Sequence, residues 1–170
     1  MAVYRAVAKT PSPTLDRRLT QLSNAANYSR LWLGIAAGLA VFGGRRARRA
    51  AALGVASIGV TSLTANAVVK PLLVRRRPDR IAAGVPEERY VRMPTSTSFP
   101  SGHAASAFAF ATVVGRELPA VAVPLHLLAL GVAYSRVHTG VHYPGDVIVG
   151  ALIGEACGVA VRRVARRHRS

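Results

Sequence analysis

The stretch AAALGVASIGVTSLTANAVV, residues 50–69, contains no Asp, Glu, Lys or Arg. A helix needs roughly 20 apolar residues to cross a bilayer core of about 30 Å, so this stretch can span a membrane on its own. Other stretches without these charged residues are 31–44, 93–115, 118–135 and 147–154, and the last continues past Glu155 to residue 161. The polar run TSTSFPSGH lies in the 93–115 stretch, so its membrane part is expected to start near Ser101. The pattern predicts an all-α integral membrane protein, a bundle of about five transmembrane helices.

The composition of the 170 residues supports this class and excludes others. Hydrophobic residues make up 51% of the chain, which excludes a disordered protein. Cys157 is the single cysteine, so a disulfide framework is excluded as well. The 23 Lys and Arg residues against 7 Asp and Glu give a net charge of +16, which a soluble domain rarely combines with so much apolar sequence. The length predicts a single domain, residues 1–170.

Both ends of the chain are predicted to lie on the membrane surface. Leu15, Leu19 and Leu22 follow helical spacing beside charged residues, so residues 1–27 are predicted to form an N-terminal interfacial segment with a helix. The basic tail, residues 162–170, is predicted to anchor to lipid head groups, and nucleic-acid binding is not expected of so buried a chain. Both membrane faces receive about ten cations, so the positive-inside rule leaves the orientation open, and the compact RRARR turn only slightly favours residues 45–49 in the cytoplasm.

Three polar stretches interrupt the predicted helices. They are KPLLVRRRP at 70–78, FPSGHAAS at 99–106 and SRVHTGVHYPGD at 135–146. With five spans, the end of the second, the start of the third and the connection from the fourth to the fifth all lie on one side of the membrane. The three stretches are therefore predicted to meet there.

The chemistry of these stretches favours a phosphate site. Lys70, Arg77 and Arg136 supply three cations, which would repel one another unless they bind an anion with more than one negative charge. A helix is expected to start after Pro100, and its first backbone N–H groups and the positive end of its dipole attract anions. Ser101 can add a hydroxyl donor, and Gly102 allows the ligand to approach the backbone closely. These residues are predicted to form a phosphate cradle.

Two histidines and a carboxylate could carry out phosphoryl transfer at this cradle. Asp146 lies four residues after His142, and Pro144 between them can start the fifth span with Asp146 in its first turn. Asp146 could then accept a hydrogen bond from one ring nitrogen of His142 and make the other more nucleophilic. His103 could protonate the leaving alkoxide. Acidic residues are too few and scattered for magnesium, and no Cys/His spacing indicates zinc, so no metal or other cofactor is expected.

The three stretches resemble the signature of the type 2 phosphatidic acid phosphatase family. Its first motif, Lys, six residues, Arg-Pro, is matched by Lys70, Arg77 and Pro78; its second, Pro-Ser-Gly-His, by residues 100–103. Its third, Ser-Arg, five residues, His, three residues, Asp, is matched by Ser135, Arg136, His142 and Asp146. Three motifs with this order and spacing are far more specific than one short pattern.

The resemblance implies a metal-independent membrane phosphatase that forms a phosphohistidine. It implies that His142 is the nucleophile, Asp146 its partner and His103 the general acid; the phosphate-binding residues would be Lys70, Arg77, Ser101, Gly102 and Arg136. The substrate would be a membrane lipid phosphate: phosphatidic acid, phosphatidylglycerol phosphate or a polyprenyl phosphate or diphosphate. The chain also resembles small actinobacterial members of the family, which points to a decaprenyl-linked phosphoribose phosphate of cell-wall biosynthesis.

Some polar residues have simpler interpretations. Arg75 and Arg76 are expected to anchor to head groups, while His126 and Glu155 are expected to be structural, Glu155 through a hydrogen bond inside the bundle. His138 is interpreted as a neighbour of the site that tunes charge or touches substrate. Two other functions remain alternatives: a protein that binds or flips anionic lipids without catalysis, and a vanadate-dependent haloperoxidase, which would be soluble and larger.

Overall fold

The computed structural model describes residues 2–10 and 13–168, and every regular element in this part of the chain is a helix. The long helices are α3, Arg30–Phe42; α4, Arg45–Leu63; α6, Gly102–Glu117; α7, Ala122–His138; and α8, Pro144–Arg167. α4 continues through a π-helical segment, Thr64–Val69, into α5, Lys70–Leu72. Each of the five predicted stretches overlaps one of these helices, and the all-α prediction is confirmed for the described residues. The predicted turn at residues 45–49 is wrong, because these residues form the start of α4. Two helical stretches, Arg45–Leu72 and Pro119–His138, are long and apolar enough to cross a membrane.

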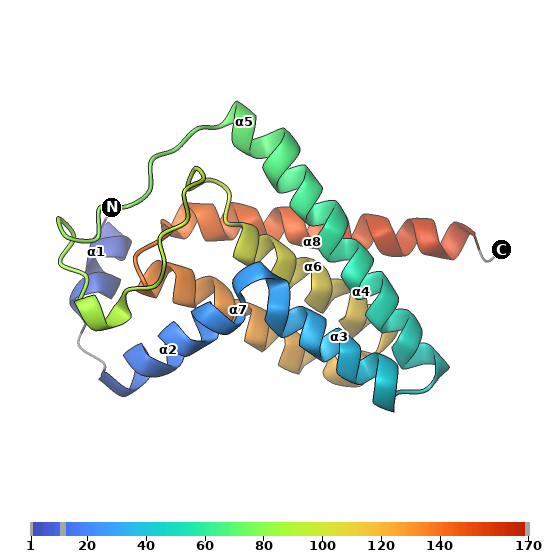
Figure 1. Ribbon diagram of the computed structural model, residues 1–170. Coiled ribbons are helices and arrows are strands. Elements are labelled where there is room, and N and C mark those ends of the chain that lie inside the picture. The colour runs from blue at the N-terminus through green and yellow to red at the C-terminus, as the bar shows by residue number, and fades with distance from the viewer. Residues whose placement is uncertain (1, 11–12, 169–170) are drawn as a thin grey trace.

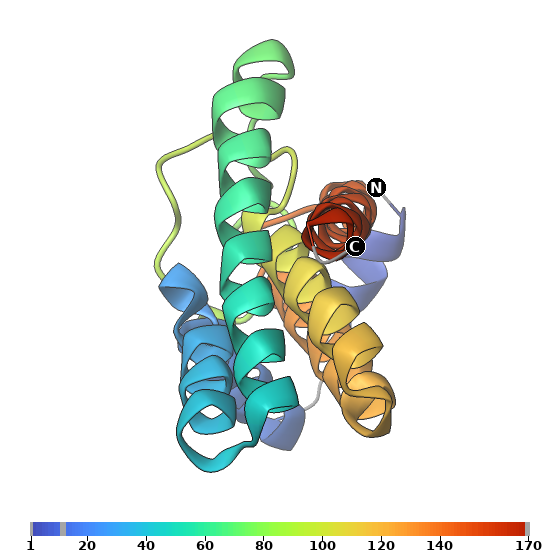
Figure 2. The same ribbon diagram turned by 90° about the vertical axis from the view of Figure 1, so that its right-hand side faces the viewer.

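The central element of the bundle is α6, which packs against α4, α7 and α8 (Figures 1 and 2). Its sequence, GHAASAFAFATVVGRE, is rich in alanine, and small side chains let helix backbones approach closely. The larger side chain of Phe110 is fully buried and lies against Trp32 of α3, with ring centroids 5.4 Å apart. Most residues of α6 are therefore buried, as expected for the helix around which the others pack.

A row of glycines brings α8 against α6. Gly150, Gly154 and Gly158 lie four residues apart on α8 and are all buried. A Cβ atom at Gly150 would lie 2.5 Å from the carbonyl oxygen of Ser101, and one at Gly154 would overlap the carbonyl oxygen of Ala105. The two backbones are thus in direct contact at the end of the bundle where α6 begins.

The N-terminal segment packs against the bundle through buried charges. It forms α1, Ala2–Lys9, and α2, Pro13–Ala25, and α2 lies along α7 (Figure 1). Asp16 of α2 accepts from His138 Nε2 at 2.8 Å and pairs with Arg89 Nε at 3.0 Å. Arg89 also donates to the carbonyl oxygen of Val7, at 3.0 Å, and so ties the 73–101 loop to the N-terminal helices. Met1, Pro11 and Ser12 of the predicted interfacial segment lie outside the described residues.

Charged residues also pair at the opposite end of the bundle. Arg162 of α8 donates to the nearly buried Glu117 of α6 at 2.9 Å, and Arg49 of α4 lies 3.7 Å from the same carboxylate. The prediction that the whole 162–170 tail is a head-group anchor is therefore wrong for Arg162, whose guanidinium ties α8 to α6. Arg169 and Ser170 of that tail lie outside the described residues. Glu155 does find a partner between helices, because His126 Nε2 of α7 lies 3.3 Å from its carboxylate.

Gly154→Ala is expected to destabilise the protein by about 1–3 kcal/mol, the usual cost of overpacking, because the added methyl group overlaps the backbone of α6. Gly59→Ala is the matched control, since a Cβ at Gly59 of α4 meets no atom within 4 Å and the change in helix propensity is the same. Thermal unfolding in detergent measures both. Equal midpoints for the two variants would contradict the close α6–α8 contact.

Candidate active site

The three polar stretches meet at one end of the bundle. The first runs from α5 into the loop that follows it, the second includes the start of α6, and the third connects α7 to α8. Arg77 Nη1 of the first stretch lies 3.3 Å from Nε2 of His142 in the third. Lys70 Nζ and Arg77 Nη2 both donate to Ser96 Oγ, at 3.2 and 3.3 Å. The predicted convergence of these segments is present in the structure.

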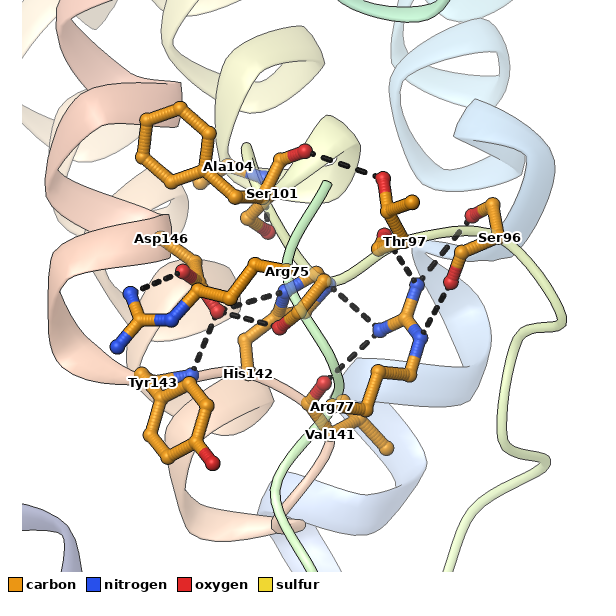
Figure 3. A network of polar contacts seen from close by, with 12 residues as sticks. Arg75, Arg77, Ser96, Thr97, Ser101, Ala104, Val141, His142, Tyr143 and Asp146 are labelled. Carbon is orange, nitrogen blue, oxygen red and sulfur yellow. Dashed lines mark hydrogen bonds and ion pairs between the residues drawn. The ribbon is translucent and has the colours of Figure 1, made fainter. Parts of the chain in front are cut away.

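Arg77 holds two loops together. Its Nη1 donates to the carbonyl oxygen of Val141 at 2.8 Å, and its Nε to that of Ser96 at 2.9 Å (Figure 3). Nη2 donates to the carbonyl oxygen of Thr97 at 3.1 Å. A guanidinium fixed by carbonyl groups on both sides keeps its full charge at a defined position. Arg77 therefore presents a positive charge to the space next to His142.

The ring of His142 lies between a cation and a carboxylate. Its Nε2 faces Arg77, and its Nδ1 lies 3.6 Å from Asp146 Oδ2, which is longer than a hydrogen bond. Because a guanidinium can only donate, Nε2 must carry the lone pair, which assigns the proton to Nδ1 on the carboxylate side. Burial of the ring, with the charges of Arg136 and Arg77, lowers the pKa of His142 to about 4, although Asp146 acts in the opposite direction. The ring is therefore neutral at pH 7.

The Asp146 carboxylate is fully buried and is satisfied by groups from both neighbouring loops. It accepts from Arg75 Nη1 at 2.9 Å, from Ser98 Oγ at 2.5 Å and from the backbone N–H of Tyr143 at 2.9 Å (Figure 3). The interpretation of Arg75 as a head-group anchor is wrong, because its guanidinium pairs with Asp146 and lies 4.3 Å from the ring centroid of Tyr143. Neither Arg75 nor Ser98 stood out from the polar sequence around the motifs, so both partners were missed.

The helix predicted to start after Pro100 does start there, with Ser101 as the N-cap of α6. The fully buried Ser101 hydroxyl accepts from the backbone N–H of Ala104 at 3.4 Å, so in this structure it caps the helix. The Ser101 N–H donates to the carbonyl oxygen of Asp146 at 2.9 Å and joins α6 to α8. A Cβ at Gly102 would meet no atom within 4 Å, so open space lies beside this part of the backbone. An anion could approach the start of α6 at this point.

His103 lies close to the other predicted site residues and has an unpredicted partner. It is within electrostatic range of Lys70, Arg77, Arg136 and His142. Its Nε2 lies 2.9 Å from Oδ1 of Asn27, in the turn Asn27–Ser29 that connects α2 to α3. The next two residues, Tyr28 and Ser29, adopt left-handed backbone conformations, with φ of 55° and 58°. No sequence pattern links Asn27 to the three motifs, which explains why it was missed.

Arg136 is almost completely buried, and its guanidinium bonds to a serine of α2. Nη1 donates to Ser23 Oγ of α2 at 2.6 Å, whereas Nε has no hydrogen-bond partner among the described residues. In the described chain none of Lys70, Arg77 and Arg136 lies within 4.0 Å of a carboxylate oxygen. Burying a cation without a counter-charge is costly, so the arrangement is suited to a bound anion.

His138, four residues before His142, faces another part of the structure. It is buried and bonded to Asp16, as described above, and its ring centroid lies 5.8 Å from that of Tyr134. This places its Nε2 in the contact between α7 and α2.

No group of three or more His, Cys, Asp or Glu side chains that could hold a metal ion occurs within residues 2–10 and 13–168.

Comparisons with known proteins agree on one family. The family model described as PAP2 superfamily matches residues 50–170. Decaprenylphosphoryl-5-phosphoribose phosphatase of Mycobacterium tuberculosis (strain H37Rv) is 40% identical over 113 residues, which cover 62% of this chain and 58% of the relative. The protein of the same name from Mycolicibacterium smegmatis is 33% identical over 154 residues, 88% of this chain and 78% of the relative.

Solved structures show the same fold. The crystal structure of Aquifex aeolicus LpxE superimposes with a TM-score of 0.76 and 28% sequence identity, covering 95% of this chain and 93% of that one. A transmembrane PAP2-type phosphatidylglycerolphosphate phosphatase from Bacillus subtilis gives a TM-score of 0.72 at 24% identity, covering 98% of this chain and 84% of that one. The family match includes all three motifs and most of the helical bundle, and the chain belongs to the PAP2 superfamily.

Proposed function

We propose that this chain is a lipid-phosphate phosphatase of the cell membrane that works through a phosphohistidine on His142. The observation that carries the proposal is the setting of the His142 ring, with Nε2 toward Arg77 and Nδ1 toward Asp146. A neutral imidazole whose lone pair faces a cluster of unpaired cations is arranged to attack a phosphorus atom held by those cations.

We propose further that α3, α4 with α5, α6, α7 and α8 span the membrane. Large apolar side chains are exposed on the outside of α3, α4, α7 and α8, where lipid would cover them. They include Val41, Phe42, Val60, Leu63, Val123, Leu127, Ile148 and Leu152. With this arrangement the phosphate site lies at one rim of the bilayer, so a substrate keeps its tail in the membrane while its phosphate reaches the cations. The same arrangement argues against a soluble haloperoxidase.

In the proposed reaction His142 Nε2 attacks phosphorus, forming the P–N bond as the bond to the leaving oxygen breaks. Protonated His103 gives its proton to that oxygen, and the lipid leaves as an alcohol. A water molecule then attacks the phosphohistidine and loses a proton to His103, and the P–N bond breaks to release phosphate. Asp146 stabilises the positive charge that the His142 ring gains in the first step. Lys70, Arg77, Arg136 and the backbone at Ser101 and Gly102 stabilise the charge on the transferring phosphoryl group.

The substrate that we propose first is a decaprenyl-linked phosphoribose phosphate, because two relatives carry that activity in their names. The alignment with the M. tuberculosis relative covers under two thirds of that protein, 58%. Other relatives are named lipid A 4'-phosphatase and undecaprenyl-diphosphatase, so other lipid phosphates and diphosphates remain candidate substrates. A non-catalytic lipid-binding role would not need the ordered His142–Asp146 pair.

His142→Ala is expected to lower kcat for lipid-phosphate hydrolysis at least about 10³-fold, because the nucleophile is lost. His168→Ala, at the exposed end of the chain, is the matched control and should retain full activity. Phosphate release in defined micelles measures both, with thermal unfolding to confirm that each variant is folded. A folded His142→Ala enzyme with more than a tenth of the normal rate would exclude His142 as the nucleophile.

His103→Ala should lower hydrolysis of a lipid phosphate by about 10²–10⁴-fold, the usual contribution of a general acid. The loss should be much smaller for p-nitrophenyl phosphate, because nitrophenolate leaves without being protonated. The ratio of the two rates therefore separates proton donation from simple damage to the site. An equal loss for both substrates would show that His103 acts in some other way.

Incubation with EDTA is expected to leave the rate of phosphate release unchanged, because the proposed steps use only protein groups. Vanadate is expected to inhibit competitively, since it resembles five-coordinate phosphorus and would occupy the same cations. Steady-state kinetics at several vanadate concentrations provide the measurement. Loss of activity in EDTA that added magnesium restores would overturn the metal-independent mechanism.

A further inference from the structure

We infer that the cavity next to His103 binds a second anionic group of the substrate, a phosphodiester, and that Arg92 recognises it. The inference rests on the proposed phosphatase function. This side cavity has a volume of about 430 Å³, and its wall includes Asn27, Tyr28, Arg92, Thr95, Ser96 and His103. It lies between the turn that follows α2 and the part of the 73–101 loop that precedes α6.

The side cavity borders the phosphate site through two residues of its wall, Ser96 and His103. Ser96 Oγ is the atom to which Lys70 and Arg77 both donate, so this part of the wall borders the cations. His103 is the proposed proton donor to the leaving oxygen. The part of the substrate attached to that oxygen must therefore lie on the His103 side, and the side cavity is the space that opens there. The side cavity thus receives the group that follows the ester being cleaved.

Arg92 distinguishes this cavity from a simple apolar groove. Most other arginines of the 73–101 loop have partners: Arg75 pairs with Asp146, Arg80 donates to the Val91 carbonyl oxygen, and Arg89 pairs with Asp16. Arg77 is held by carbonyl groups, as described above. Within the described residues, Arg92 makes no hydrogen bond and no ion pair, although it lines the cavity. Its guanidinium is available to a ligand, and its planar fork suits a phosphate oxygen pair.

The other residues of the cavity wall indicate what kind of linker joins the two anionic groups of the substrate. Asn27 and Thr95 offer amide and hydroxyl groups, and Tyr28 is 75% exposed, with the guanidinium carbon of Arg30 5.4 Å from its ring centroid. Such groups bind short hydroxylated units, for example a glycerol or a pentose. The preferred substrate class is therefore a phosphomonoester joined through a hydroxylated linker to a phosphodiester that carries the lipid. Phosphatidic acid, whose ester oxygen leads directly to diacylglycerol, would leave Arg92 without a partner.

The test compares phosphatidylglycerol phosphate with phosphatidic acid of identical acyl chains in the same micelles. The wild-type protein is expected to show a kcat/KM at least tenfold higher for phosphatidylglycerol phosphate. Arg92→Gln should reduce this ratio about tenfold, as expected for the loss of one charge-assisted hydrogen bond. Arg76→Gln is the matched control: Arg76 is an exposed cation of the same loop that does not line the cavity, and its replacement should change the ratio less than twofold.

The outcomes separate the inference from the proposed function. If the wild-type protein hydrolyses both lipids and Arg92→Gln leaves the ratio unchanged, the phosphodiester site is excluded while the phosphatase stands. An equal fall in the ratio for both variants would assign the preference to general surface charge and would also exclude the site. If neither lipid releases phosphate, the proposed function fails, and the inference fails with it.

Discussion

The buried carboxylate of Asp146 is the constraint on which the rest of the site depends. It accepts hydrogen bonds from the loop before α6 and from the connection between α7 and α8, and its own carbonyl oxygen accepts from the first turn of α6. An unsatisfied buried carboxylate would be costly, so these segments must come together for the chain to fold. Its Oδ2 also lies 3.6 Å from Nδ1 of His142, so the carboxylate that holds these segments together faces the ring of the proposed nucleophile.

A second set of polar contacts comes from the N-terminal segment. Asp16 and Ser23 of α2 bond to His138 and Arg136 of α7, and Asn27 in the next turn bonds to His103 of α6. Because α2 packs against α7, the first two of these bonds lie in the contact between those helices, and the third joins the turn after α2 to the start of α6. The segment that precedes the family match is therefore part of the site's surroundings, and it orients residues that lie within the three motifs.

The sequence predicted the five long helices because each overlaps an apolar stretch that the charge pattern sets apart. It placed the start of α4 too late, since the arginine-rich residues 45–49 resemble a turn but are helical. It predicted the meeting of Lys70, Arg77, His103 and His142 because motif spacing and span number determine which ends share a face. It could not predict Arg75, Ser98 or Asn27 as partners of the site, since those contacts depend on the path of an irregular loop and a turn. Arg162 was misassigned for a related reason: a charge run does not reveal which member faces a buried Glu117.

The glycine contact between α6 and α8 has a mechanical consequence for the site. At Gly150 the two helices touch through backbone atoms alone, so no flexible side chain lies between them to absorb a displacement. The Ser101 amide and the Asp146 carbonyl, hydrogen-bonded beside this contact, must shift as a unit when α8 tilts. In a bilayer, where we propose that both helices lie, a tilt of α8 would carry the start of α6 with it, and the spacing between the Ser101 amide and Asp146 would stay constant.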